Sequence, residues 1–148
     1  MIRRARADEA AAVTALAHRA FAVYLPRTGL PPAPMLTDYH AAIAAGLVDV
    51  AIEAHIVAGM LLLRDRPDHL FLDVIAVDPP LAGHGIGRAL LDHAEAEARR
   101  RHHPEIRLFT HAAITEPQAI YLRRGYVETS RATSEGRPRV YFSKRISL

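Results

Sequence analysis

The sequence predicts an α/β protein built on one mixed sheet with helices packed against it. Apolar residues alternate with a period of two in some segments and follow the helical period of about 3.6 residues in others. In chain order, these segments are β-α-α-β-β-β-α-β-α-β-β. The chain has 148 residues, half of them hydrophobic, with no internal repeat or linker-like tract. This length and composition indicate one domain, residues 1–148, with a substantial core.

The first third of the chain predicts a short strand and two helices. Asp8 is a suitable N-cap for the first helix, whose apolar residues recur at helical spacing until the prolines begin. Residues 26–34 contain four prolines and one glycine, which indicates an irregular loop. Thr37 or Asp38 is the expected cap of the second helix, and Gly46 is the expected glycine after its end.

Runs rich in β-branched and aromatic residues predict the strands. They lie at residues 2–5, 48–54, 56–63, 70–77, 106–110, 126–129 and 139–146. Ala54-His55 is a short turn, so the second and third runs are expected to form an antiparallel hairpin. The run at 70–77 is apolar on both faces except at Asp73, which is typical of a central buried strand.

Two further helices are expected after the central strand. The helix at residues 85–101 is amphipathic, and Glu95 is expected on its polar side with the other charged residues. The last helix is short. Pro117 in its first turn and Gly125 after its last turn mark its boundaries.

A glycine-rich turn, with glycines at 83, 85 and 87, joins the central strand to the amphipathic helix. Such a turn leaves backbone N–H groups unpaired at a helix N-terminus, and these donors suit a phosphate or pyrophosphate. A P-loop is excluded because Arg88 and Ala89 stand where Lys and Ser or Thr are required. A dinucleotide fingerprint would need its third glycine at the position of Arg88. A tight turn without a ligand is the alternative interpretation.

Composition excludes several classes of protein. The absence of cysteine rules out disulfides, thiolate metal sites and a cysteine nucleophile. No apolar run approaches the roughly 20 residues of a membrane span, and the basic N-terminus lacks a secretion signal, so a cytoplasmic location is expected. The net charge of +3 comes partly from the helix end Arg99-Arg100-Arg101, a typical solvated surface, and nucleic acid is not an expected partner. No metal site is expected, because the adjacent His102 and His103 do not share a helix face.

Two motifs resemble the GNAT N-acetyltransferase superfamily, and in particular its bacterial small-amine members. The first motif matches at Val77, Pro79, Gly85 and Gly87. The second matches at Ile120, Tyr121, Gly125 and Tyr126. Ala82 departs from the pattern, because the family usually has Arg or Gln there. The resemblance spans nearly the whole chain and implies the GNAT acyl-CoA N-acyltransferase fold, whose central sheet splays open between its fourth and fifth strands.

The resemblance implies acetyl transfer from acetyl-CoA to a primary amine of a small molecule or peptide. The residues implied at the cofactor are Ile75, Ala76, Val77, Ala82, Gly83, His84, Gly85, Ile86, Gly87, Arg88 and Pro117. The strand would present backbone groups to pantetheine, and an N–H near Ile75 would polarise the thioester carbonyl. Pro117 replaces an Asn that follows Thr-Glu in related proteins, and this change predicts weaker cofactor binding.

The resemblance also implies catalytic roles. Tyr121 is the implied general acid, because a phenol with a pKa near 10 still carries its proton at pH 7; a purely structural core aromatic is the alternative. The amine must lose a proton before it attacks the acetyl group. The candidate bases are His69, Asp73, His111 and Glu116.

The acceptor pocket is expected between the first two helices and the loop that joins them. The candidate acceptor residues are Tyr24, Met35, Asp38 and Tyr39. Two other functions stay open at this point. A non-catalytic sensor or regulatory domain that binds acyl-CoA would explain the changes at Ala82 and Pro117. A toxin that acetylates aminoacyl-tRNA would require a basic patch around the acceptor cleft. Homodimer formation is a further expectation from the resemblance.

Overall fold

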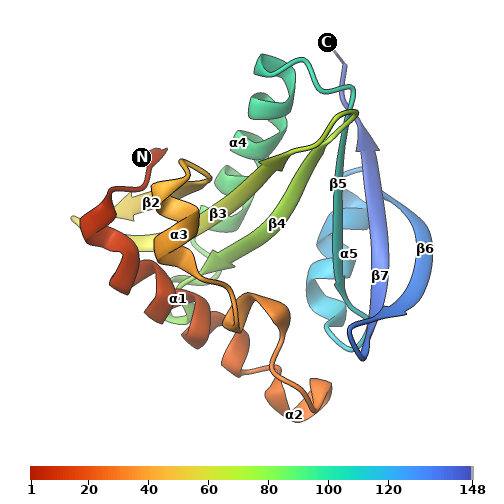
Figure 1. Ribbon diagram of the computed structural model, residues 1–148, viewed down its shortest axis with the longest axis horizontal. Coiled ribbons are helices and arrows are strands. Elements are labelled where there is room, and N and C mark those ends of the chain that lie inside the picture. The colour runs from red at the N-terminus through yellow and green to blue at the C-terminus, as the bar shows by residue number, and fades with distance from the viewer. Residues whose placement is uncertain (148) are drawn as a thin grey trace.

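The computed structural model describes residues 1–147 and contains a seven-stranded mixed sheet in the order β1-β2-β3-β4-β5-β7-β6 (Figure 1). The strands are β1 (Ile2–Arg4), β2 (Val48–Glu53), β3 (Ile56–Asp65), β4 (Leu70–Val77), β5 (Glu105–His111), β6 (Val127–Ser134) and β7 (Arg137–Arg145). The α-helices are α1 (Ala10–Ala22), α2 (Leu25–Thr28), α3 (Tyr39–Ala44), α4 (Ile86–Arg100) and α5 (Thr115–Arg123). Short 3-10 turns are η1 (Ala7–Glu9), η2 (Ala33–Met35) and η3 (Pro79–Leu81). The predicted α/β class is confirmed.

The sheet opens in its middle. β4 and β5 are parallel and pair at only two positions, Leu70 with Ile106 and Phe71 with Arg107. Beyond these pairs the two strands diverge, and Figure 1 shows them separating towards their C-terminal ends. The other neighbouring strands are antiparallel along most of their length. The predicted splay between the fourth and fifth strands is therefore confirmed.

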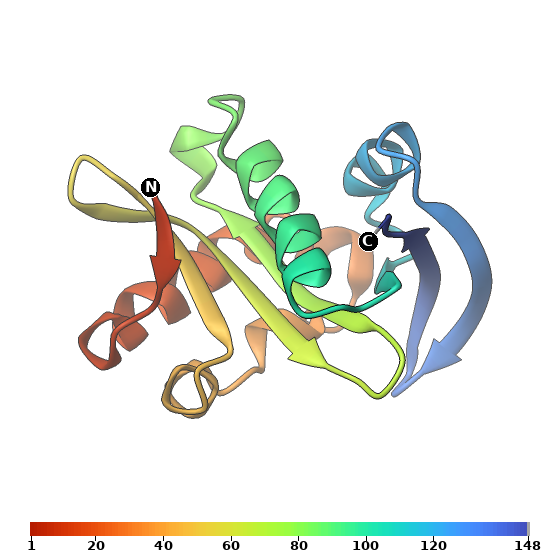
Figure 2. The same cartoon turned by 90° about the horizontal axis from the view of Figure 1, so that it is seen from above.

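Helices cover both faces of the sheet and create two hydrophobic cores (Figures 1 and 2). α1 and α3 pack on one face of β2, β3 and β4, with Val13, Leu16 and Tyr39 fully or almost fully buried there. α4 and α5 pack on the opposite face, where Leu90 and Tyr121 belong to the second core. Each core buries the apolar stripe of its helices, which is the main driving force for the fold.

A β-bulge interrupts β4 at Asp73. Leu62 of β3 pairs with Val74, and the next residue, Leu63, pairs with Leu72, so Asp73 has no partner on β3. Leu72 and Val74 consequently pack into different cores although they are two residues apart. The alternating pattern of apolar residues along β4 could not predict that its side chains change faces at this bulge. Bulges are common beside functional sites, because they redirect a side chain.

The start of the first helix differs from the prediction. Asp8 lies inside η1 and makes no capping hydrogen bond. Instead, the Glu9 carboxylate accepts a hydrogen bond of 2.8 Å from the Arg6 N–H, and it also pairs with Arg3 at 2.7 Å. Glu9 can do this because Arg3 on β1 neutralises it close to the helix start.

The proline-rich segment is more ordered than the predicted irregular loop, because it contains α2 and η2. Pro26 lies in the first turn of α2, where its missing N–H costs no helical hydrogen bond. Asp38 caps α3 as expected, accepting a hydrogen bond of 3.0 Å from the Ala41 N–H. No helix within residues 1–147 is long and apolar enough to cross a membrane.

Candidate active site

A cavity of about 800 Å³ occupies the opening between β4 and β5. Its walls come from both halves of the sheet, from the starts of α4 and α5, and from the proline-rich segment. Of the residues predicted at the site, those that line the cavity are Tyr24, Asp73, Ile75, Ala76, Val77, Ala82, Gly87, Arg88, His111, Pro117 and Tyr121. The fold thus brings together residues from five separate segments of the chain.

The glycine turn lies at one end of this cavity. Gly83 and Gly85 have φ angles of +84° and +83°, which L side chains rarely adopt, and nothing lies within 4 Å of the position of an added Cβ. Within residues 1–147, the N–H groups of Ile86, Gly87 and Arg88 have no backbone partner, because the first helical bond of α4 is donated by Ala89. The turn is therefore open, unobstructed and rich in donors, and it fits a phosphate group.

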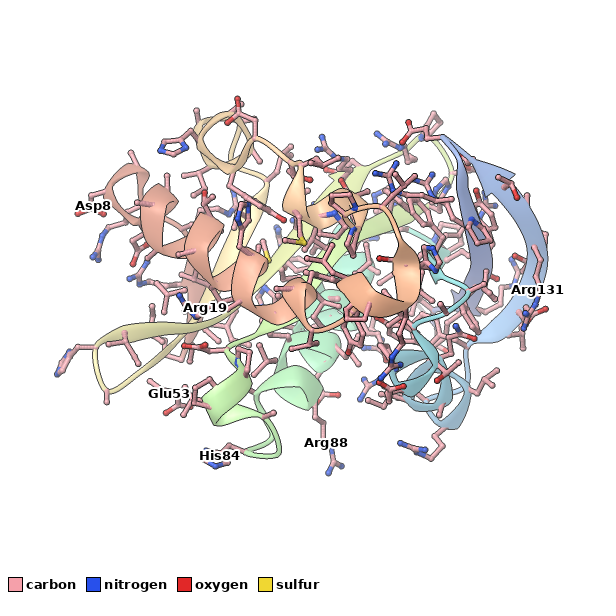
Figure 3. The ribbon with its side chains drawn as sticks, turned by 90° about the horizontal axis from the view of Figure 1, so that it is seen from below. Asp8, Arg19, Glu53, His84, Arg88 and Arg131 are labelled. Atoms are coloured by element: carbon pink, nitrogen blue, oxygen red, sulfur yellow. The ribbon has the colours of Figure 1, made fainter. Side chains whose placement is uncertain are left out.

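The side chains of this turn point in different directions. Figure 3 shows His84 and Arg88 extending away from the protein beside the turn, so Arg88 can add positive charge next to the free N–H groups. Ile86 instead points inward and is 6% exposed. Ala82 is exposed and lines the cavity. The missing Arg or Gln at this position removes a side-chain contact but leaves the backbone donors in place.

Gly59 on β3 fixes the position of this turn, although no sequence motif identified it. A Cβ at Gly59 would lie 3.0 Å from Ile86 Cγ2, 3.0 Å from Leu90 Cδ1 and 3.1 Å from the Ala76 carbonyl oxygen. α4 therefore packs against bare backbone at its first two turns. The close approach holds the N-terminus of α4 against β3 and β4.

The diverging edge of β4 forms a second wall. Ile75, Ala76 and Val77 line the cavity, and beyond Phe71 the strand has no pairing partner on β5. Its backbone groups on that side are free to pair with an extended ligand, as a neighbouring strand would. This geometry fits the predicted pantetheine contact.

Tyr121 is nearly inaccessible to solvent, at 6% exposure, yet it lines the cavity. Its ring packs against Tyr126 and Phe142, with centroids 5.7 Å and 5.8 Å away. Within residues 1–147 its hydroxyl has no hydrogen-bond partner. Burial, and to a smaller extent Tyr24, raises the pKa of Tyr121 well above its usual value. The phenol therefore keeps its proton at neutral pH and has that proton available for a ligand.

The end of α5 holds this tyrosine in place. Gly125 adopts a φ of +95°, and the following N–H, of Tyr126, donates to the Tyr121 carbonyl at 3.0 Å. The Tyr126 side chain then reaches Glu95 of α4, donating a 3.3 Å hydrogen bond. These contacts form a C-terminal helix cap that also places the two tyrosine rings side by side.

Glu95 corrects the sequence interpretation, because it is buried at 6% exposure instead of lying on the polar side of α4. It accepts hydrogen bonds from Arg124 at 2.9 Å and Lys144 at 2.9 Å. A buried carboxylate is tolerated when cations neutralise it, and here the two cations come from the ends of α5 and β7. Glu95 thereby joins α4, α5 and β7 behind the cavity.

The fold places the four candidate bases at different sites, and only two of them line the cavity. Asp73 and His111 line the cavity, and Asp73 accepts a hydrogen bond of 2.8 Å from Arg64. His69 lies in a separate groove and pairs with Asp68 at 2.8 Å. Glu116 lies outside the cavity lining and is exposed.

His111 has a constrained ring. Its Nδ1 accepts a hydrogen bond of 3.0 Å from the Ala113 N–H, so the neutral ring carries its proton on Nε2. Burial, together with the charges of Arg137 and Arg139, lowers the pKa of His111. A neutral His111 therefore offers a donor to the cavity.

Only some of the candidate acceptor residues lie at the cavity. Tyr24 lines the cavity, whereas Met35, Asp38 and Tyr39 do not. Tyr39 is a core residue at 1% exposure and donates a hydrogen bond of 2.6 Å to the Pro34 carbonyl oxygen. The helical period could not distinguish this core position from a pocket position.

The proline-rich segment reaches across the opening between the two halves of the sheet. Arg27 of α2 pairs with Glu116 of α5 at 2.7 Å. Arg137 of β7 donates to the Pro31 carbonyl at 2.9 Å. The segment from α2 to η2 therefore covers one mouth of the cavity, and no local pattern in the chain predicts these long-range contacts.

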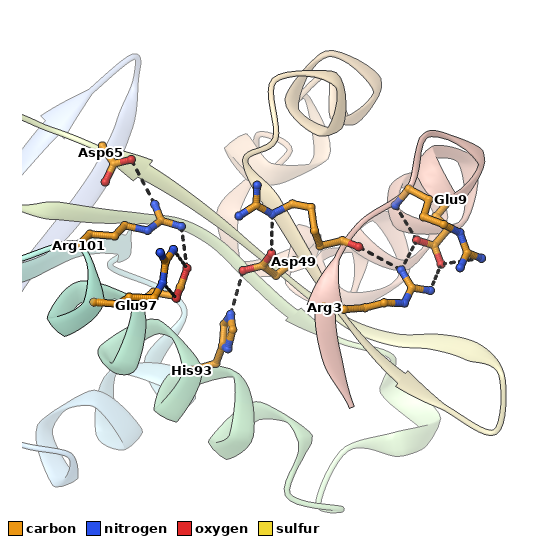
Figure 4. A network of polar contacts seen from close by, with 10 residues as sticks. Arg3, Glu9, Asp49, Asp65, His93, Glu97 and Arg101 are labelled. Atoms are coloured by element: carbon orange, nitrogen blue, oxygen red, sulfur yellow. Dashed lines mark hydrogen bonds and ion pairs between the residues drawn. The ribbon is translucent and has the colours of Figure 1, made fainter.

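A separate polar cluster lies outside the cavity (Figure 4). Asp49, His93 and Glu97 place potential metal-ligand atoms within 4.8 Å of one another. Asp49 already pairs with Arg4 at 2.9 Å and His93 at 2.9 Å, and Glu97 pairs with Arg100 at 2.7 Å. Arg4, His93 and Arg100 thus occupy the carboxylate oxygens, and the cluster is a polar network that connects β1, β2 and α4.

The splayed mixed sheet, the open glycine turn and the buried tyrosine in its cleft match the fold and the motifs that the sequence predicted. The profile of the acetyltransferase (GNAT) family matches residues 11–126, most of the chain, and the protein belongs to this family. The resemblance to the GNAT superfamily is thereby confirmed, and the small-amine subtype stays a prediction. No curated protein is a significant sequence match to this chain.

Solved structures show the same fold. The PaiA N-acetyltransferase of Thermoplasma acidophilum, in complex with coenzyme A, aligns with a TM-score of 0.83 and 16% identity, covering 98% of each chain. The ribosomal-protein-S18-alanine N-acetyltransferase of Escherichia coli aligns with a TM-score of 0.79 and 22% identity, covering all of this chain and 94% of the other. Ard1 of Thermoplasma volcanium aligns with a TM-score of 0.78 and 20% identity, covering all of this chain and 98% of the other. The family and the fold together support acetyl-CoA as the cofactor.

Proposed function

We propose that this protein transfers an acetyl group from acetyl-CoA directly to a primary amine of a small molecule or peptide. One observation carries the proposal: a single cavity is lined by the two ends of the glycine turn, at Ala82 and Gly87, by the unpaired edge of β4 and by the protonated Tyr121. Acetyl-CoA, when bound, supplies an acetyl group activated as a thioester. Family membership and the coenzyme A complex of the T. acidophilum relative support this assignment.

The chain's own residues then have distinct tasks. The N–H groups of residues 86–88 bind phosphate oxygens, and β4 pairs with the extended arm of the cofactor. An N–H near Ile75 donates to the carbonyl oxygen, where negative charge develops. Tyr121 gives its proton to the departing thiolate.

A group in the cavity acts as the general base that removes the proton from the amine. Asp73 is the candidate that the cavity favours, because it is a carboxylate at the bulge of β4, the strand that pairs with the cofactor in this proposal. His111 is less suited, since its Nδ1 lone pair is already occupied by the Ala113 N–H. An alkyl ammonium has a pKa near 10, so the neutral amine is only about one part in a thousand at pH 7 without such help.

The test combines calorimetric titration of acetyl-CoA with a thiol-release assay over a panel of amines. Tyr121→Phe should retain cofactor binding and lower kcat by about 10²- to 10⁴-fold. Tyr141→Phe is the matched control, because Tyr141 lies in the separate groove and outside the cavity lining. Its kcat should equal that of the wild type.

Each other outcome has a clear meaning. Absence of acetyl-CoA binding at millimolar concentration would refute the proposal. Binding without turnover on any amine would favour the non-catalytic sensor. Full activity of Tyr121→Phe would reject its role as the general acid. Homodimer formation and cytoplasmic location stay predictions from the sequence.

A further inference from the structure

The side of the cavity that faces α1 and the proline-rich segment carries charges that the transfer step does not use. β5 and β7 pair there with His111 opposite Arg139 and Phe109 opposite Tyr141. The intervening residues of β7, such as Val140, belong to the core beneath α4 and α5. By alternation, Arg139 and His111 lie on the face of these strands that α5 does not cover. This side faces α1 and the proline-rich segment, where the acceptor pocket is expected.

Arg139 is an unusual buried cation. It is 8% exposed, and its guanidinium lies over the Phe109 ring with 4.2 Å to the centroid. Its ion pair with Glu135 is long, at 3.4 Å, and the Glu135 side chain is 72% exposed. A guanidinium has five N–H donors, and buried charges are normally balanced by close partners. Within residues 1–147, Arg139 makes no other side-chain hydrogen bond or ion pair, so most of its donors are unused at the cavity wall.

His111 adds a second donor beside Arg139. Its ring is fixed by the Ala113 N–H at Nδ1, which leaves Nε2–H as the donating atom. Both residues line the cavity and are cross-strand neighbours. Arg137 also lines the cavity, but its guanidinium is already committed to the Pro31 and Glu135 carbonyl oxygens. Two adjacent donors, one of them charged, form a site for a carboxylate.

Asp73 supplies the opposite charge on the other lip of the cavity. It lies on β4, across the opening from β7, and shares its carboxylate with Arg64 at 2.8 Å. The cavity thus presents a carboxylate on β4, the strand where acetyl transfer is proposed, and a guanidinium on β7, beyond β5. This arrangement complements a molecule that has an ammonium group at one end and a carboxylate at the other.

We infer that the acceptor is an amine that also carries a carboxylate. The carboxylate binds Arg139 and His111 Nε2–H, and the ammonium group enters beside Asp73. The inference rests on the proposed acetyltransferase function and specifies its substrate class. Arg139 is a specificity-determining residue in this scheme, and the anion it binds is distinct from the phosphates at the turn before α4, which have their own donors.

The test compares matched pairs of acceptors in the thiol-release assay, namely β-alanine with its amide and leucine with its amide. The amine of each amide is less basic, because the acid's carboxylate stabilises the ammonium form. A preference for the acid therefore cannot come from a larger fraction of neutral amine. The wild type should favour the acids by about 10- to 100-fold in kcat/KM, as expected for a hydrogen-bonded charge pair.

Variants assign this preference to a residue. Arg139→Gln should remove the preference by raising KM for the acids, with KM for the amides changed less than about 2-fold. Arg139→Lys should restore part of it. Arg131→Gln is the control for loss of a positive charge, because Arg131 is exposed on β6 and pairs with Glu128 at 2.9 Å. This variant should keep the full preference.

The outcomes separate the inference from the proposed function. Equal kcat/KM for acids and amides in the wild type would overturn the inference and leave acetyl transfer intact. An equal rise of KM for both series in Arg139→Gln would make Arg139 structural and would also overturn it. Acetyl-CoA binding without acetylation of either series would reject the inference while the cofactor site stands. Failure to bind acetyl-CoA would refute the proposed function itself.

Discussion

Gly59→Ala is a stringent test of how the cofactor turn is held. The added methyl would contact the Ile86 and Leu90 side chains at 3.0 Å and the Ala76 carbonyl oxygen at 3.1 Å. Both side chains are buried, at 6% and 0% exposure, so they cannot swing into solvent. α4 must therefore move away from β3 by a few tenths of an ångström. Such a shift moves the free N–H groups at its N-terminus.

The size of the effect follows from two opposing contributions. Overpacking in a close-packed core costs about 1–3 kcal/mol. Replacing glycine by alanine also restricts the unfolded chain, which offsets about 0.4–1 kcal/mol. The free energy of unfolding should therefore decrease by about 1–2 kcal/mol in total. For a chain of this length, that loss corresponds to a decrease in Tm of roughly 2–8 °C.

Thermal unfolding and calorimetric titration of acetyl-CoA measure the two consequences separately. Gly59→Ala should lower Tm and weaken acetyl-CoA binding several-fold. Gly87→Ala is the comparison for stability alone, because its Cβ would lie 3.6 Å from Val77 Cγ2, an ordinary contact in a helix where alanine is favoured. Its Tm should equal or exceed that of the wild type. A Gly59→Ala protein with unchanged Tm and unchanged affinity would show that this contact does not position the turn.

Two further predictions concern charges. Glu95→Gln leaves Arg124 and Lys144 without their shared buried carboxylate, so urea unfolding should show a loss of about 2–3 kcal/mol; a loss below about 0.5 kcal/mol would contradict the proposed connecting role. Hydrogen bonds from arginines lower the pKa values of Glu9 and Glu97 to about 2. The stability that these two ion pairs contribute is complete above the unfolded pKa of about 4.5 and is lost as the pH falls towards 2. In the Glu9→Gln and Glu97→Gln variants, the unfolding free energy should therefore decline less steeply between pH 4.5 and pH 2 than in the wild type.

The sequence predicted the order of elements well, because each strand and helix has a strong local pattern. It was less accurate where long-range contacts override local preference. Asp8 is a good cap in isolation, yet Glu9 takes that task because Arg3 lies beside it in the fold. Glu95 has the spacing of a surface residue, yet cations from two distant segments bury it. No local pattern contains these partners.

The candidate site shows the same division. The glycine turn and Tyr121 could be found from sequence, since each is a short motif whose geometry is set within a few residues. Arg139 and Gly59 could not be found, because their importance depends on β5 pairing with β7 and on α4 packing against β3. The prediction of Met35 and Asp38 as acceptor residues rested on proximity in the chain, and the fold places both outside the cavity lining.

The sequence by itself determined the fold class, the glycine turn and the tyrosine helix. These depend on hydrophobic periodicity and on backbone conformations that glycine and proline impose locally. Only the tertiary structure decided which charges share the cavity. β4 and β7 bring Asp73 and Arg139 to the same opening, although the two residues are far apart in the chain. The proposed recognition of the acceptor depends on this juxtaposition, which the topology of the sheet creates and no single segment of the chain contains.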